Sequence, residues 1–150
     1  MKPRFAPLSA LVLPLALSLV CSSLAAQEVT RTPLPADHPV VGTWRIELPE
    51  QKCWESYQIR ADGTVRVSSG SERSESEFEI SLEPTAAGFY KWTDKIVKDN
   101  GKPDCSGEVM ELGHVSVNYI ALHKTGRMFL LCEREDLEEC IGPFVRQEEL

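Results

Sequence analysis

The stretch WESYQIRADGTVRVSS, residues 54–69, decides the fold. Its two halves, 54–60 and 64–69, alternate between apolar and polar side chains with a period of two, which is typical of half-buried β-strands. Ala61-Asp62-Gly63 separates the halves, and a short turn containing glycine is how adjacent antiparallel strands are joined. The sequence therefore predicts a β-hairpin. Its apolar positions are Tyr57, Ile59, Val65 and Val67.

The same alternation continues on both sides of this hairpin. Before it, residues 41–48 place Trp44 and Ile46 on one face and polar side chains on the other. After it, residues 71–76 are polar throughout and are predicted to form a connection, whereas 77–82 alternate again. We therefore expect one strand before the hairpin and one after it.

The second half of the chain repeats this pattern of short strands and turn residues. The strands predicted there are 89–96, 108–112, 115–122, 128–132 and 142–146. The only helix we expect is a single turn within 134–140. Seven to nine short strands linked in chain order predict an all-β fold, an antiparallel up-and-down meander. We expect a closed or nearly closed small barrel, because closure removes edge strands.

The first 26 residues predict a secretory signal peptide. Lys2 and Arg4 precede an apolar run at 8–20, and small residues end the segment. An apolar run of ~13 residues is shorter than the ~20 that a membrane-spanning helix needs. Lipidation at Cys21 is the alternative interpretation, which would make this cysteine the mature N-terminus.

Export places the mature protein in the periplasm or outside the cell. Residues 27–39 contain three prolines and few large apolar side chains, so we expect an extended leader outside the core. The barrel domain is predicted to span residues 40–146, and residues 147–150 form a C-terminal tail.

Four cysteines remain after signal removal, and an even number in an exported chain predicts disulfides. Three pairings are possible. We favour Cys132 with Cys140, because residues 133–139 form one acidic loop between them, and this choice leaves Cys53 with Cys105. The chain has neither a Cys-x-x-Cys pair nor histidines at metal-binding spacing, so we expect no metal and no cofactor.

The net negative charge of the chain argues against two classes of partner, nucleic acids and anionic membranes. The 150 residues contain 16 Lys and Arg and 23 Asp and Glu, and removal of Lys2 and Arg4 changes the formal net charge from −7 to −9. Proteins that bind nucleic acids need a basic face to release counterions from phosphates. Anionic membrane surfaces also attract basic segments. We therefore expect that the protein binds neither nucleic acids nor membrane surfaces. We also expect it to be a monomer.

Val41-Gly42-Thr43-Trp44 resembles the Gly-x-Trp motif that opens lipocalins, fatty-acid-binding proteins and avidins, which together form the calycin group of small barrels. The resemblance implies that Trp44 closes one end of the barrel. It further implies a basic side chain from a late strand against that Trp, with Arg146 or Arg127 as the candidates. A guanidinium over an indole ring gains cation–π energy. A calycin-like barrel implies an internal ligand.

Four large aromatic residues are the candidates for holding such a ligand. They are Trp54, Tyr57, Tyr90 and Trp92. Aromatic walls with a few polar groups are how small pockets hold apolar or flat molecules. The alternative is that these side chains simply fill the core, because the mature chain has few aromatic residues.

The charged residues are predicted to lie outside the barrel. Alternation puts Arg45, Arg60 and Arg66 opposite the apolar face. The oxygen-rich stretch 94–104 lacks the ligand order of the 12-residue calcium loop. The acidic residues of 133–139 suit either a solvated loop or a docking surface for a basic partner.

No catalytic constellation stands out, so we predict that the protein is not an enzyme. Ser69-Gly70-Ser71 lacks the frame of a nucleophile elbow, and nothing marks His114 or His123 as a general base. The leading hypothesis is an exported binding protein that holds a small apolar or amphipathic ligand inside a lipocalin-like barrel. The alternative is a periplasmic inhibitor or immunity-type protein that binds a basic exported protein through its acidic surface.

Overall fold

The structure is a computed structural model that describes residues 28–148. The predicted signal peptide, residues 1–26, and the end of the tail, residues 149–150, lie outside the described residues. No helix of the described chain is long and apolar enough to cross a membrane.

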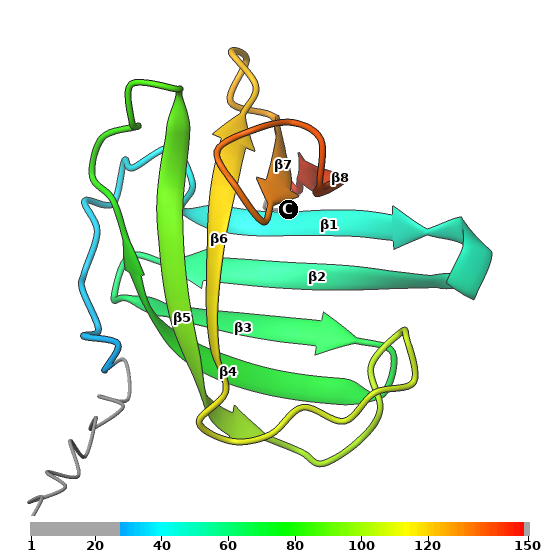
Figure 1. The fold of residues 1–150 in the computed structure, drawn as a ribbon. Coiled ribbons are helices and arrows are strands. Elements are labelled where there is room, and N and C mark those ends of the chain that lie inside the picture. Colours follow the sequence, from blue (N-terminus) through cyan, green and yellow to red (C-terminus); the bar gives the residue numbers. More distant parts are fainter. Residues whose placement is uncertain (1–27, 149–150) are drawn as a thin grey trace, which may run out of the picture.

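Eight strands and one short 3-10 helix, η1, make up the regular structure of residues 28–148. In chain order they are β1 (Gly42–Leu48), η1 (Pro49–Gln51), β2 (Cys53–Arg60), β3 (Thr64–Ser69), β4 (Glu72–Ile80), β5 (Phe89–Asp99), β6 (Val115–Leu122), β7 (Met128–Cys132) and β8 (Cys140–Arg146). Each strand pairs antiparallel with the next, and β8 pairs with β1, so the sheet is a closed barrel (Figure 1). The predicted all-β meander is confirmed.

The hairpin predicted from residues 54–69 forms as β2 and β3. Tyr57 pairs with Val67 and Ile59 with Val65, so the apolar residues share the inner face. Gly63 has φ of +84°, which a side chain disfavours, and its turn is closed by Asp62, whose Oδ1 accepts the Thr64 N–H at 3.0 Å. Local turn chemistry and alternation thus act together at this position.

Strand β4 begins earlier than alternation indicates. We expected 71–76 to be a connection, but β4 starts at Glu72 and ends at Ile80. The prediction failed because Glu72, Ser74 and Ser76 are polar residues on the inner face, so neither face of this part of the strand is apolar. A register shift between Glu75 and Ser76 marks the change from polar to apolar interior.

Two other predicted elements are absent from the described chain. Residues 108–112 lie within the loop that joins β5 to β6, and residues 134–140 form bends without a helix before entering β8. In the first segment, backbone hydrogen bonds are local, such as Asp104 N–H to the Glu108 carbonyl at 2.8 Å. In the second, the loop is closed by the Glu133 N–H to the Glu139 carbonyl at 3.0 Å.

Both predicted disulfides are present, Cys53–Cys105 and Cys132–Cys140. The first ties the start of β2 to the β5–β6 loop. The second closes the acidic loop between β7 and β8. Both therefore lie at the same end of the barrel, which we call the disulfide end.

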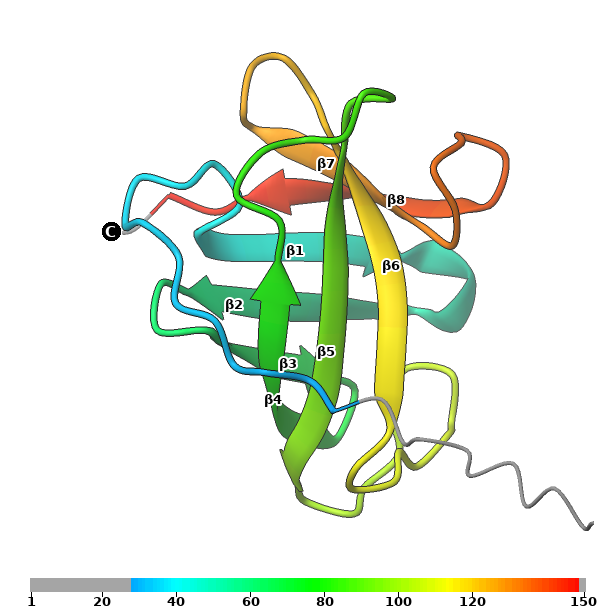
Figure 2. The ribbon, with the colours of Figure 1, turned by 60° about the vertical axis from the view of Figure 1, so that its left-hand side comes forward.

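The leader is extended, but it is not outside the core. It runs across the opposite end of the barrel, which we call the leader end (Figure 2). The Thr32 N–H donates to the Phe78 carbonyl at 2.9 Å, and Leu34 belongs to the buried apolar cluster. The expectation was wrong for Leu34 because an end of a barrel exposes apolar side chains that a passing segment can cover.

Candidate functional site

The interior of the barrel is divided into two halves. The half near the leader end is filled by large apolar side chains, among them Trp44, Phe129 and Phe144. Phe129 and Phe144 stack with ring centroids 4.6 Å apart, and Trp44 meets Phe129 edge-on at 4.7 Å. This half is packed, and it holds the barrel closed.

The half near the disulfide end contains a cavity of about 190 Å³. Its aromatic and apolar walls are Tyr57, Val65, Val67, Trp92, Ile96, Met110 and Leu131. Its polar walls are Glu55, Ser69, Glu72, Ser74, Ser76, Asp94, Asp104, Ser116 and Asn118. The cavity is smaller than the ~300–1,000 Å³ of pockets for drug-sized ligands, and its lining is more polar than the mainly apolar lining of such pockets.

Glu55 is held in place by two hydroxyl groups. The Tyr57 hydroxyl donates to Oε2 at 2.9 Å, and the Ser69 hydroxyl donates to Oε1 at 2.5 Å. Ser69 Oγ in turn accepts the N–H of Cys105 at 2.9 Å, so the disulfide-bound loop is fixed to this network. Burial and the Glu55 carboxylate raise the pKa of Tyr57 well above its usual value, so the phenol stays a donor.

Glu72 is a buried carboxyl group among other carboxyl groups, with only 4% of its surface exposed. Burial and the adjacent carboxylate of Asp99 raise its pKa from 4.5 to about 7. The carboxylates of Asp104 and Glu55 act in the same direction. Glu72 therefore stays protonated to a higher pH than an exposed carboxyl group does.

Asp94 faces the same cavity from β5. Burial raises its pKa from 3.8 to about 6, although the Ser76 hydroxyl and the His114 side chain oppose the shift. Asp104, on the β5–β6 loop, differs: burial is outweighed by the Ser106 hydroxyl and the Glu108 N–H, which lower its pKa. Asp104 is thus a stable anion, whereas Asp94 and Glu72 titrate near neutral pH.

The indole N–H of Trp92 has no acceptor. Trp92 is 3% exposed and lines the cavity, and its Nε1 is a buried donor without a hydrogen-bond partner in the described chain. A buried N–H left without an acceptor costs about 1–3 kcal/mol. The nitrogen lies within the wall and is not open to the cavity, whereas other atoms of Trp92 line it.

Two of the four predicted ligand-binding aromatics, Tyr57 and Trp92, line the cavity. Tyr90 does not, although it lies on the same strand as Trp92. It sits nearer the leader end, where its ring meets His38 edge-on at 5.2 Å. Tyr90 is therefore part of the closure of that end, and its assignment to the ligand site is corrected.

Trp54 lies on the outer surface, with 44% of its surface exposed. The guanidinium of Arg45 lies over its ring at 4.2 Å from the centroid. Its assignment to the ligand site was wrong because it is an odd number of positions from Tyr57 on β2, and strand alternation sends the two to opposite faces.

At the leader end, Arg146 covers Trp44, with its Cζ 4.1 Å from the ring centroid. Its three nitrogens donate to the carbonyls of Val41 at 2.8 Å, Pro39 at 2.5 Å and Gly126 at 3.1 Å. A Cβ at Gly42 would overlap the guanidinium, and φ of +139° at Gly42 disfavours a side chain. The spacing Gly-x-Trp therefore leaves room for this arginine.

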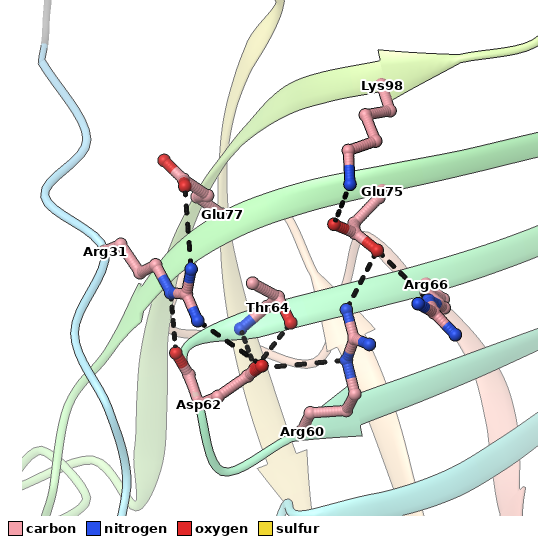
Figure 3. Close-up of polar contacts among 8 residues, drawn as sticks. All are labelled: Arg31, Arg60, Asp62, Thr64, Arg66, Glu75, Glu77 and Lys98. Atoms are coloured by element: carbon pink, nitrogen blue, oxygen red, sulfur yellow. Dashed lines mark hydrogen bonds and ion pairs between the residues drawn. The ribbon is translucent and has the colours of Figure 1, made fainter.

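An ion cluster lies on the outer face, where Arg60 and Arg66 were expected (Figure 3). Glu75 accepts from Arg60 Nη2 at 2.9 Å, Arg66 Nε at 3.0 Å and Lys98 Nζ at 2.9 Å. These three cations hold the pKa of Glu75 at about 2. The cluster joins β2, β3, β4 and β5 from outside and leaves the interior without a basic group from these strands.

The acidic loop 133–139 neutralises part of its own charge. Arg134 pairs with Asp136 at 3.1 Å and with Glu139 at 3.4 Å.

Among residues 28–148, no group of three or more His, Cys, Asp or Glu has a geometry that would hold a metal ion.

Sequence reasoning did not identify the polar half of the cavity. Glu55, Glu72, Asp94 and Asp104 line it, and none of them was predicted to face an internal ligand, although Asp94 and Asp104 belong to the stretch that was weighed for calcium. A signal existed at Glu55, which shares the face of Tyr57 and Ile59 by strict alternation, and at Asp94, which shares that of Trp92. Their charge made them resemble surface residues.

Comparison of the chain with protein-family models, with curated proteins and with solved structures gives no match.

Proposed function

We propose that this chain is an exported, non-enzymatic binding protein that holds a small amphipathic molecule in the cavity at the disulfide end. The single observation that carries the proposal is the cavity of about 190 Å³, walled by Tyr57 and Trp92 on one side and by hydroxyl and carboxyl groups on the other. The ligand needs an apolar part for the aromatic wall and a polar part for the opposite wall.

Two further observations support this proposal. A predicted signal peptide and two disulfides are typical of proteins that fold in the periplasm or outside the cell. Gly42 and Trp44, with Arg146 stacked on the indole, support a calycin-like barrel, a group that binds ligands internally.

The test is ligand-induced change in the indole N–H signals of the ¹⁵N-labelled protein in NMR spectra. A panel of small aromatic alcohols, amines and acids is added, and Trp92→Phe identifies the signal of the cavity. We expect members of the panel to move the Trp92 signal and to leave that of Trp54, on the outer surface, unchanged.

A pair of matched variants locates the binding. Ser116→Leu places a larger side chain in the cavity, whereas Ser56→Leu places the same side chain on β2 outside it. We expect the first variant to abolish binding and the second to keep it. A panel that leaves the Trp92 signal in place, or binding that survives Ser116→Leu, would overturn the proposal.

A further inference from the structure

Resting on this proposed function, we infer that the cavity is specific for an organic cation, a small amine whose ammonium group faces Glu55, Glu72 and Asp94 and whose apolar part lies against the rings of Trp92 and Tyr57.

The first argument is the charge of the wall. Carboxylates reach the cavity from β2, β4, β5 and the β5–β6 loop, and its lining in the described chain includes no Lys or Arg. Arg60, Arg66 and Lys98 are engaged outside the barrel at Glu75. Buried charges without counter-ions are costly, and a ligand cation supplies the missing partner.

The second argument is that the carboxyl groups are held in place before any ligand binds. Two hydroxyls fix Glu55, and Asp104 accepts the N–H of Ser106 at 2.8 Å and of Glu108 at 2.9 Å. An ammonium group has three donors, so it can contact several such oxygens at once. The raised pKa values of Glu72 and Asp94 support the same inference. Burial favours the neutral carboxyl groups, and a bound cation lowers both pKa values again because it stabilises the carboxylates.

The third argument is the aromatic wall formed by Trp92 and Tyr57. A carboxyl cluster alone is satisfied by any cation, including a hydrated metal ion. The two rings add apolar contact and cation–π attraction, which favour an organic cation. Together these features require one molecule with a cation and an apolar body.

Three compounds of one shape test the charge. Tyramine, tyrosol and 4-hydroxyphenylacetate share a phenol ring and a two-carbon arm that ends in an ammonium, a hydroxyl or a carboxylate group. Titration calorimetry at pH 7.5 and low salt should rank tyramine at least tenfold tighter than tyrosol, with the acid weakest. Tyrosol equal to tyramine would overturn the cation inference and leave the proposed function intact.

Neutral isosteres test the residues. Glu55→Gln, Glu72→Gln and Asp94→Asn should each reduce the tenfold preference for tyramine over tyrosol by at least threefold. Glu79→Gln, an exposed carboxylate on the same strand as Glu72, is the matched control and should keep it. Unchanged preference in all three cavity variants would overturn the assignment.

Two outcomes separate the remaining alternatives. Trp92→Leu should weaken the binding of tyramine at least tenfold, because the ligand loses one aromatic wall of the cavity. A different outcome is that tyramine does not bind, whereas calcium binds to the wild-type protein and not to Glu72→Gln. That outcome would overturn the inference of an organic cation in favour of a metal ion. No binding of the three compounds, while other members of the panel move the Trp92 signal, would overturn the cation inference alone.

Discussion

Arg146 concentrates several functions in one side chain. It stacks on Trp44 and donates to the backbone of the leader, of the residue before β1 and of the β7 hairpin turn. No other residue type combines a planar cation with donors in three directions. One guanidinium thus joins three backbone segments at the leader end.

We expect Arg146→Lys to lower the free energy of unfolding by about 2 kcal/mol, because the ammonium keeps the charge but loses the stacking and most of the hydrogen bonds. Urea unfolding measures the change. Arg127→Lys is the control, since Arg127 pairs only with the exposed Glu148 in the described chain. A loss no larger than that of the control would show that stacking adds nothing.

Glu75 gives a pH dependence at the same scale. Its pKa is lowered from 4.5 to about 2 by Lys98 and Arg66 and, less strongly, by Arg60. The carboxylate therefore stabilises the fold fully above pH 4.5, and this contribution is lost as the pH falls toward 2. Because Arg66 and Lys98 are largely exposed, solvent screening limits the contribution of Glu75 to the free energy of unfolding to about 1–2 kcal/mol.

Glu75→Gln should consequently be less stable than the wild-type chain at pH 7, and the difference should shrink as the pH is lowered. Thermal unfolding across this range measures it. Glu47→Gln serves for comparison, because Glu47 is mostly exposed and has Arg45 as its ion-pair partner. A difference that does not change with pH would mean that the charge of Glu75 is not the cause.

At the scale of elements, the β5–β6 loop forms part of the cavity wall. Asp104 and Met110 line the cavity, and Cys53–Cys105 ties the loop to β2. The Ser71 N–H donates to the Pro103 carbonyl at 3.2 Å, which adds a second attachment.

The two disulfides should differ in what their loss costs. Cys53 and Cys105 are 52 residues apart and Cys132 and Cys140 are 8 apart, so chain entropy predicts losses of about 4 and about 2.5 kcal/mol. Double Cys→Ala variants, compared by urea unfolding, measure this order. We also expect only the first pair to weaken ligand binding. The reverse order of stabilities would contradict the entropic account.

At the scale of the whole molecule, the fold could be predicted from the sequence because it rests on local signals. Alternation and the Asp62-Gly63 turn are each visible within a few residues of sequence. The even cysteine count limited the disulfides to three possible pairings. The position of Arg146 did not come from these signals: the resemblance at Gly42-Thr43-Trp44 implied Arg146 or Arg127 as the partner of Trp44, and Arg146 lies over that ring.

The candidate site could be predicted only in part. Tyr57 and Trp92 fit the expected aromatic wall, but the carboxyl groups opposite them did not. Alternation assigns faces by assuming that the interior is apolar, and β4 violates this assumption at Glu72, Ser74 and Ser76. Polar residues in a strand therefore conceal a polar cavity as easily as they indicate a surface.

The seam between β1 and β8 has a consequence for how the chain reaches this fold. It is registered at only two pairs, Trp44 with Arg146 and Arg45 with Val145, which join opposite ends of the barrel sequence. Forming these two pairs closes a loop of on the order of a hundred residues, and the loss of chain entropy opposes that closure. The β2–β3 hairpin carries no such cost. We therefore expect barrel closure to come after hairpin formation, with Arg146 stabilising the closed form.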